Sequence, residues 1–424
     1  MQDIVRQLDD CSRRAFVSHA AKAALGVSLL PAPIFAAPKG AGSSQKSFCD
    51  NVIFLYMKGG MSHIDTFDPK TTDVKGMSSP IRTKSPDLRI SNLLPKLAQL
   101  GNHLAVVRSM AVRTGAHAEA SYAMHTGFSM RPGTSHPHMG SWAQRFLGKR
   151  KHDLPDSVIV SGGNPGPGFF PPDHSPFPIG NPQKGIRDLL PKVPQNRFEK
   201  RVKLARRFAK AFEKYFPHED VKAYSDFYDQ TIRFFNGEAS EAFDLLKEPR
   251  PMRERYGEDS FGQGCLLARR LVEKGVRYVE VKFKQSWDVM HRGMDPVEEL
   301  AASLDGPFSE LIKDLKSRGM LNRTLVVLAT EFGRSPKINQ SGGRDHHPKA
   351  FSCVLAGGGV NGGQAIGATD PRGNGAKGET YQPKNLHATM AHALGLPLDE
   401  RIHGSGGRPF FVGGQAKPIP GLFG

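Results

Sequence analysis

The sequence has few cysteines and no pattern that would organise them. Four occur, namely Cys11, Cys49, Cys265 and Cys353. Their scattered spacing contains no Cys-x-x-Cys pair, which excludes a dense disulfide framework and a cysteine-based zinc site. We expect small buried side chains, with at most one disulfide.

Several motifs of well-known protein classes are also missing. The chain has no Gly-x-Gly-x-x-Gly followed by an acid, no P-loop, no Gly-x-Ser-x-Gly and no His-Glu-x-x-His. These absences remove support from most nucleotide-binding and serine-hydrolase interpretations and from the zincins. The formal net charge is +17, but no zinc finger, RNP motif or Lys/Arg block accompanies it. The charge therefore favours polyanionic substrates or anionic surfaces, and we predict no nucleic-acid partner.

Long apolar runs are absent, and this bears on the N-terminus. The uncharged stretch Ala23–Ala37 is far short of the ~20 residues that span a bilayer. The segment Ser12–Val17, with the pair Arg13-Arg14, resembles the twin-arginine export signal. We predict a signal peptide at 1–37, a linker at 38–48, and a periplasmic or secreted chain with the twin-arginine machinery as a partner. The mature chain is expected to have no transmembrane segment; the alternative for the N-terminus is an ordinary amphipathic helix.

Short β-rich apolar runs alternate with helical periodicity along the rest of the chain. The runs predicted as strands are Asn51–Met57, Leu104–Arg108, Val276–Phe283, Leu325–Ala329 and Phe351–Leu355. Such alternation predicts an α/β fold with a mostly parallel central sheet and helices on both faces, spanning 49–424. Residues 185–250 are predicted to form a helical insertion, and the Pro- and Gly-rich segment 161–182 a surface loop.

The run Leu325–Ala329 leads into a concentration of charged and imidazole side chains. In open α/β sheets, ligands bind at the carboxyl ends of the strands. A carboxylate follows the strand, and an acid and two imidazoles follow in the next loop, so we predict metal ligands there: Glu331, Asp345, His346 and His347. Two guanidinium groups, Arg334 and Arg344, are predicted to bind an anionic group of the substrate. The alternative is a polar surface turn.

Two further clusters follow other predicted strands. His63 or Asp65 could ligate a metal after the first strand, where the alternative is a capped turn. Asp288 and His291 form a carboxylate–imidazole cluster after Val276–Phe283. His117 lies between a polar loop and a helix, where free backbone N–H groups suit an anion. The predicted cofactor is one or two divalent ions, with zinc, calcium or magnesium as candidates.

Three motifs carry a resemblance to a known family. The segments Gly59–Lys70, Glu331–Lys337 and Gly343–Pro348 look like the family catalogued as domain of unknown function 1501, and the order of elements matches over nearly the whole mature chain. The resemblance implies an exported bacterial protein of the alkaline phosphatase and sulfatase superfamily. It also implies a metal-supported fold for phosphoryl or sulfuryl ester hydrolysis.

The sequence departs from that pattern at informative positions. Met61 stands where the family usually has Pro, and two residues separate Asp288 from His291 where one is common. The Cys-x-Pro-x-Arg motif of sulfatases is absent, and the place of its nucleophile falls near His117. His117 therefore has a different catalytic part, or the site is a degenerate binding pocket.

Two functions follow from these residues. The first is an exported metal-dependent hydrolase of phosphate or sulfate esters, with an anionic small molecule or anionic polysaccharide as its partner. The second is a non-catalytic binding or surface-assembly protein on the same fold, because fold alone does not fix function.

Overall fold

The computed structural model of the protein describes residues 46–424 apart from residues 75, 151–152, 187–192, 218–220, several positions between 223 and 237, and 405–406. The predicted signal peptide at 1–37 and most of the predicted linker at 38–48 therefore lie outside the described residues. Among the helices that are described, none is long and apolar enough to cross a membrane.

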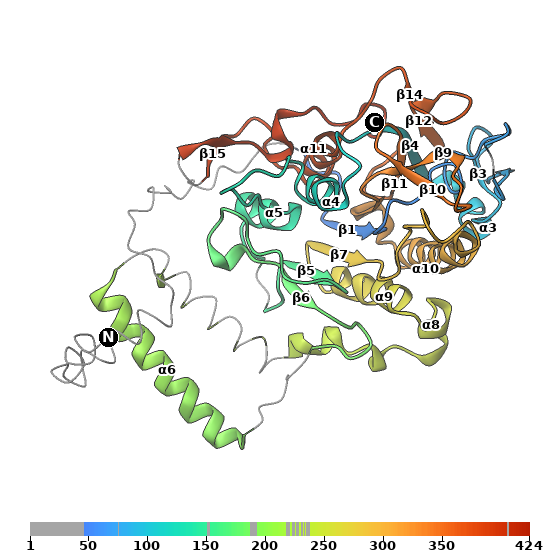
Figure 1. The fold of residues 1–424 in the computed structure, drawn as a ribbon. Coiled ribbons are helices and arrows are strands. Elements are labelled where there is room, and N and C mark those ends of the chain that lie inside the picture. Colours follow the sequence, from blue (N-terminus) through green and yellow to red (C-terminus); the bar gives the residue numbers. More distant parts are fainter. Residues whose placement is uncertain are drawn as a thin grey trace, which may run out of the picture.

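A central sheet of eight strands organises the fold (Figure 1). In spatial order the strands are β12 (Gln364–Ile366), β4 (Leu104–Met110), β11 (Phe351–Ala356), β8 (Thr324–Ala329), β1 (Asn51–Tyr56), β7 (Tyr278–Lys282), β5 (Ser157–Val160) and β6 (Phe177–Ile179). Strand β11 runs antiparallel to both of its neighbours, and every other neighbouring pair in this sheet is parallel. The predicted α/β class with a mostly parallel sheet is confirmed.

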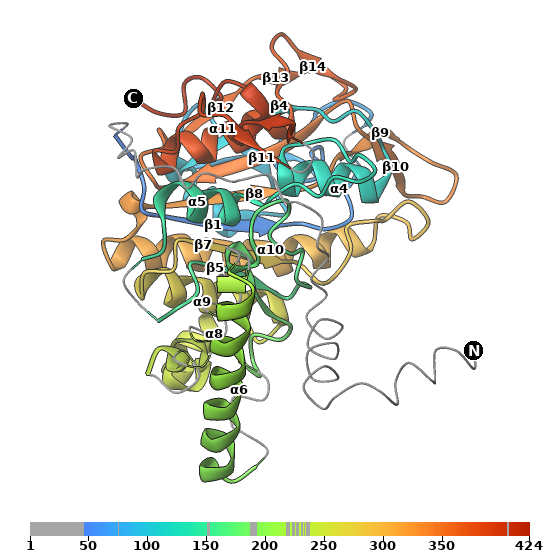
Figure 2. The ribbon, with the colours of Figure 1, turned by 90° about the vertical axis from the view of Figure 1, so that its left-hand side faces the viewer.

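Helices cover both faces of this sheet. The helices in the described part of the chain are α3 (Pro95–Ala98), α4 (His117–Thr126), α5 (Met139–Leu147), α6 (Gln195–Tyr215), α8 (Arg250–Arg255), α9 (Ser260–Glu273), α10 (Pro296–Ser317) and α11 (Pro383–Leu394). Short 3-10 turns lie at η1 (Gly101–His103), η2 (Pro172–His174), η3 (Glu238–Phe243), η4 (Leu245–Lys247), η5 (Leu321–Arg323) and η7 (Val412–Gln415). Helices α9 and α10 lie on one side of the sheet, and α4, α5 and α11 lie on the other (Figures 1 and 2).

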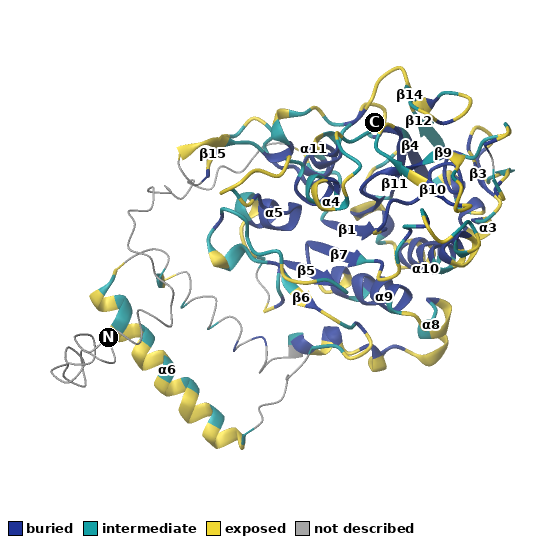
Figure 3. Cartoon of the chain, in the orientation of Figure 1, coloured by how far each residue is buried: buried dark blue, intermediate teal, exposed yellow. Residues whose placement is uncertain are grey.

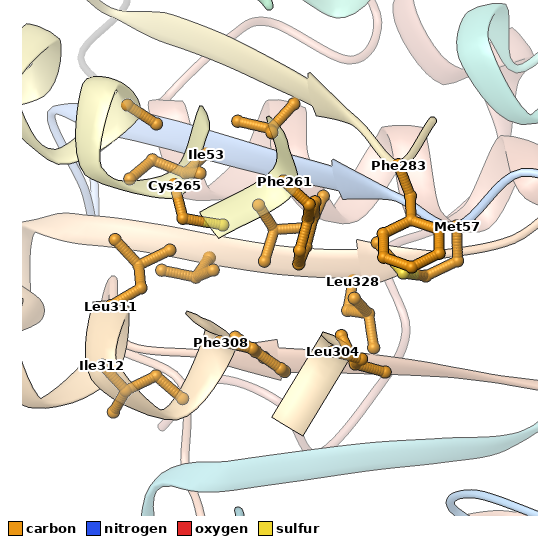
Figure 4. Close-up of a cluster of buried hydrophobic side chains, with 14 of the residues drawn as sticks. Ile53, Met57, Phe261, Cys265, Phe283, Leu304, Phe308, Leu311, Ile312 and Leu328 are labelled. Carbon is orange, nitrogen blue, oxygen red and sulfur yellow. The ribbon is translucent and has the colours of Figure 1, made fainter. Parts of the chain in front are cut away.

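Strand β1 shows why two helical layers are needed. Its side chains alternate between the faces of the sheet. Ile53 (Figure 4) and Leu55 belong to the core under α9 and α10, and Val52 and Phe54 belong to the core under α4, α5 and α11. All six residues of β1 are buried, as expected for a central parallel strand with both faces covered. The predicted helices on both faces are confirmed.

Two segments predicted as loops contain strands. Residues 333–347 form a hairpin of β9 (Gly333–Ile338) and β10 (Arg344–His347), because pairing between two short extended segments satisfies their backbone groups. Edge strand β6 lies within the predicted loop 161–182. The remaining two-stranded sheets are β2 (Pro80–Arg82) with β3 (Arg89–Ser91), β13 (Ala368–Thr369) with β14 (Ala376–Lys377), and β15 (Ile402–His403) with β16 (Pro409–Phe410).

Helix α6 lies within the 185–250 segment, for which a helical insertion is predicted. It stands away from the sheet and shows no buried residue, unlike the helices that cover the sheet (Figure 3). The sheet and its covering helices, not α6, therefore position the site.

Candidate metal centre

Three side chains from separate elements meet beyond the carboxyl edge of the sheet. His117 begins α4, Asp288 follows β7, and His346 lies in β10. One ligand atom from each lies within 4.8 Å of the others. The Nε2 atom of His117 is 3.1 Å from Nε2 of His346 and 3.2 Å from a carboxylate oxygen of Asp288. These three residues are named the metal group below.

The far side of each imidazole is fixed by a hydrogen bond. Nδ1 of His117 lies 2.8 Å from a carboxylate oxygen of Glu331, and Nδ1 of His346 lies 2.9 Å from the carbonyl oxygen of Gly115. Both partners can only accept, so both Nδ1 atoms carry hydrogen. In the neutral rings, the two Nε2 lone pairs then face each other at 3.1 Å. Either a proton or a cation must lie between them.

Glu331 is buried and fully engaged behind His117. It accepts hydrogen bonds from the Tyr56 hydroxyl at 2.9 Å and from the backbone N–H of Gly59 at 2.7 Å. Burial alone would raise the pKa of Glu331, but the hydrogen bond with His117 and those from the backbone lower it. In turn, the hydrogen bond to Glu331 raises the pKa of His117. A carboxylate behind a ligating histidine is the usual arrangement that orients the ring and raises its basicity.

Arg334 holds Asp288 from the buried side. Its guanidinium is 2.9 Å from a carboxylate oxygen of Asp288, and it also donates to the carbonyl oxygens of Gly59, Gly60 and Arg344. Burial raises the pKa of Asp288, but the nearby charge of Arg334 outweighs this and lowers it. Because the Arg334 side chain has 0% exposure, it orients a carboxylate and is not available to an incoming anion.

Arg344 and Asp65, two further predicted site residues, pair with each other inside the protein. Arg344 donates two bonds to the Asp65 carboxylate and three to the carbonyl oxygens of Val74, Ser335 and Pro336. Five N–H groups are all that a guanidinium has, so none remains for a substrate. Both side chains have 0% exposure. The structure thus does not bring Arg344 or Asp65 into the metal group.

The other predicted ligands lie elsewhere. His347 contacts the carbonyl oxygen of Asn374 at 2.6 Å, and Asp345 accepts from Asn339 at 2.8 Å. His63 is buried, with Nε2 3.0 Å from the carbonyl oxygen of Gly373. His291 is exposed, and no hydrogen bond to its side chain is found among the described residues.

Three contributors to the site could not be assigned from the sequence. Tyr56 lies one residue before the end of the predicted strand Asn51–Met57, and its hydroxyl could have faced either side of the sheet. The carbonyl of Gly115 carries no signal in its residue type. Gly59 has a φ of +105°, and a Cβ there would lie 2.5 Å from the backbone nitrogen of Trp287. Glycine at this position therefore lets the segment that carries Asp288 approach the end of β1.

The donor set fits a divalent transition metal. Two imidazoles and one carboxylate match the ligands of catalytic zinc sites, which keep one position open. Calcium and magnesium prefer oxygen ligands and fit less well. With neutral imidazoles, Glu331 and Asp288 exceed Arg334 by one negative charge, which a cation would offset. The side chains of His117 and Asp288 are 36% and 37% exposed, so the group is open to solvent.

The fold and this group define an α/β protein with a candidate metal centre at the carboxyl edge of its sheet. The chain belongs to the family described as Protein of unknown function (DUF1501), which matches residues 49–423. The resemblance seen in its three motifs is thereby confirmed. The search of curated proteins returned no match.

Among solved structures, the chain is similar to phosphatase- and sulfatase-like proteins. One is the lipoteichoic acid synthase LtaP from Listeria monocytogenes, at 10% identity and a TM-score of 0.38, with 85% of this chain and 77% of that chain covered. A sulfatase from Pseudoalteromonas sp. has 12% identity and a TM-score of 0.36, with 82% and 68% covered. Alkaline phosphatase from the Antarctic bacterium TAB5 has 10% identity and a TM-score of 0.29, with 78% and 96% covered. At this distance the residues of the metal group have to carry the functional argument.

Proposed function

We propose that this protein is a metal-dependent hydrolase of phosphate or sulfate esters, with one zinc-like divalent ion at the metal group. The observation that carries the proposal is the 3.1 Å approach of the two Nε2 atoms, whose tautomers are both set by hydrogen bonds on Nδ1. A carboxylate oxygen of Asp288 completes a set of three ligands.

Each residue around the group has a defined part in this proposal. His117, Asp288 and His346 would hold the ion. Glu331 keeps the proton of His117 on Nδ1, and Arg334 donates to one carboxylate oxygen of Asp288, which leaves the other oxygen 3.2 Å from Nε2 of His117. A divalent ion bound there would polarise the ester and lower the pKa of a bound water. His117, predicted as a catalytic residue, becomes a ligand in this proposal.

Zinc content tests the proposal most directly. After chelator treatment and incubation with zinc, we expect one zinc per chain in the wild type and less than about 0.1 in His346→Ala. His347→Ala is the matched control, because this neighbouring histidine contacts Asn374 instead of the metal group. Zinc at 100 times its Kd should stabilise the wild type and His347→Ala by about 2.7 kcal/mol, and leave His346→Ala unchanged. No zinc in the wild type, or equal loss in both variants, would contradict the proposal.

Turnover separates the two functions that the sequence left open. Zinc-loaded wild type should hydrolyse p-nitrophenyl phosphate or p-nitrophenyl sulfate, and His346→Ala should not. Stoichiometric zinc without hydrolysis of either ester would favour the alternative, a metal-containing binding protein on the same fold.

Export by the twin-arginine route remains part of the proposal and rests on Arg13-Arg14. Accumulation of an Arg13→Lys/Arg14→Lys precursor in the cytoplasm would support it.

A further inference from the structure

A separate cavity lies beside α4, on the side of the molecule where α11 packs. Its volume is about 740 Å³, in the range of small-molecule sites. The lining comes from several separate segments, which include the loop before α4, the segment after it and the start of α11. Because Arg334 and Arg344 are both buried and engaged, a substrate anion needs cations from somewhere else.

Four basic side chains surround this cavity: Arg113, Arg131, Lys384 and Arg401. All four are exposed, and none forms an ion pair with a carboxylate among the described residues. Glu119 is the one acid in the lining, so the wall carries a net charge of three positive units. Arginine guanidinium groups suit the planar, multiple hydrogen bonds that phosphate and sulfate oxygens accept. The cations are therefore free to meet a ligand anion.

A buried histidine, His136, also lines the cavity. The hydroxyl of Tyr122 accepts the backbone N–H of His136 at 2.8 Å, and it lies 2.6 Å from Nδ1 of the same residue. The hydroxyl can donate its hydrogen to Nδ1 in the tautomer that carries the ring hydrogen on Nε2, and these two bonds hold the ring in place. Burial and the charge of Arg131 lower the pKa of His136 to about 4, so the ring is neutral at pH 7.

Aromatic side chains add apolar surface to the lining. The ring of Phe128 stacks on His136 with centroids 4.5 Å apart and planes 8° apart, and Phe410 packs edge-on against both rings. Phe411 also lines the cavity. Cations and aromatic rings in one lining suit a ligand that has a ring and several anionic groups, and not a lone inorganic ion.

The loop before α4 connects this cavity to the metal group. Residues Val112, Arg113 and Thr114 line the cavity, and the carbonyl of Gly115 accepts the hydrogen bond from His346. Helix α4 continues the same wall, with His117 in its first turn and Glu119 facing the cavity. A ligand held in the cavity therefore lies next to the loop that positions two of the three metal ligands.

We propose that this cavity binds ring-bearing polyanions with at least two sulfate or phosphate groups, held by Arg113, Arg131, Lys384 and Arg401 together with the rings of Phe128 and Phe410. Binding in the cavity is independent of the metal group. Its role as the site for the part of the substrate beyond the reacting ester rests on the proposed function. The class includes sulfated sugars and nucleotides, which share ring and charge, and the test includes a probe of each.

Calorimetric titration can test this on the full-length folded protein. The probes are sucrose octasulfate, ATP, neutral sucrose and inorganic sulfate. We expect sucrose octasulfate or ATP to bind at least tenfold more tightly than inorganic sulfate, and sucrose not to bind. Whichever of the first two binds more tightly identifies the source of the ligand. Arg131→Gln/Lys384→Gln should weaken that probe at least tenfold, and Glu119→Gln should tighten it two- to fivefold.

Two controls separate the cavity from net charge and from the metal group. Arg82→Gln/Lys84→Gln removes the same two charges from exposed residues outside the cavity and should change affinity less than twofold. His346→Ala should also retain the probe within twofold. Equal losses in both double variants would overturn the proposal, and so would loss of the probe in His346→Ala or no binding to the wild type. Failure of zinc binding with retained probe binding would instead contradict only the proposed function.

Discussion

Two of the histidine and carboxylate clusters in the described part of the chain include residues of helix α4, and they differ in almost everything except composition. One is the metal group with Glu331. The other surrounds Glu280 in the middle of β7. Nε2 of His125 is 3.0 Å from its carboxylate, Nζ of Lys282 is 3.3 Å away, and Nδ1 of His138 is 3.6 Å away.

Solvent access separates the two clusters. The Glu280 side chain has 0% exposure, whereas Asp288 has 37%. At Glu280, Lys282 already lies beside the carboxylate, and a buried charge needs such a partner. At Asp288 the cation, Arg334, contacts one carboxylate oxygen from the buried side and leaves the other 3.2 Å from Nε2 of His117. Residue types therefore suggest chemistry, but burial and the position of the cation decide which cluster can accept a ligand.

Helix α4 links the clusters. His117, Ser121 and His125 recur at four-residue intervals, so they lie on one face of the helix. Between the two clusters, the Tyr56 ring lies 4.2 Å from that of His125, and its hydroxyl donates to Glu331. One helix face thus supplies an open cluster at its first turn and a closed one at its last turn.

The largest expected difference between the clusters is in stability. Glu280→Gln removes the buried charge that offsets Lys282, and we expect the free energy of unfolding to fall by about 3–5 kcal/mol. Asp288→Asn keeps an oxygen that accepts from Arg334 in a partly exposed place, so a change within about 1 kcal/mol is expected. Urea denaturation of both variants in the presence of a chelator checks this. Equal destabilisation would mean that both clusters are structural.

The next effect concerns pH. Burial raises the pKa of Glu280, but the charges of His125 and Lys282 outweigh it and hold the pKa well below 4.5. Burial lowers the pKa of His138 below 6.5 and that of His387 to about 4. All three folded pKa values lie below the unfolded ones, so their stabilisation is complete above pH 6.5 and is lost as pH falls.

Unfolding measured at several pH values checks this sign. His387 alone should contribute a decline of about 3 kcal/mol between pH 6.5 and 4. Glu280→Gln should retain the decline that begins at pH 6.5 and lack the additional loss below pH 4.5, whereas Asp288→Asn should follow the wild type. A wild-type stability that rises on acidification would contradict the assignment of neutral buried histidines.

The smallest effect tests the link between the clusters. Tyr56→Phe removes one hydrogen-bond donor from Glu331 and leaves those from Gly59 and His117. We expect a loss of about 1 kcal/mol in stability and a weaker zinc affinity, because Glu331 orients His117 less firmly. Thermal unfolding with and without zinc measures both quantities. Unchanged zinc affinity would show that Glu331 orients His117 without help from the Tyr56 hydroxyl.

The sequence by itself determined the class of fold and the edge of the sheet at which a site would lie. Alternating apolar runs and helical periods predict an α/β sheet with two helical layers, because strands that are buried on both faces consist of consecutive apolar residues. Polar residues after the strand runs pointed to the carboxyl edge, since parallel strands end there together. The family motifs can also be recognised in the sequence, because each one is a contiguous segment of the chain.

Only the tertiary structure decided which of these polar residues act together. Arg344, Asp345, His346 and His347 are consecutive, yet one is buried against Asp65, two bond to surface partners and only His346 faces His117. These four residues form β10 of a hairpin that the sequence pattern did not predict, and successive side chains of a strand point in opposite directions. The tautomer of His346 is set by the carbonyl of Gly115, 231 positions away. Contacts of this kind depend on how distant segments pack, so they cannot be predicted from the local order of residues.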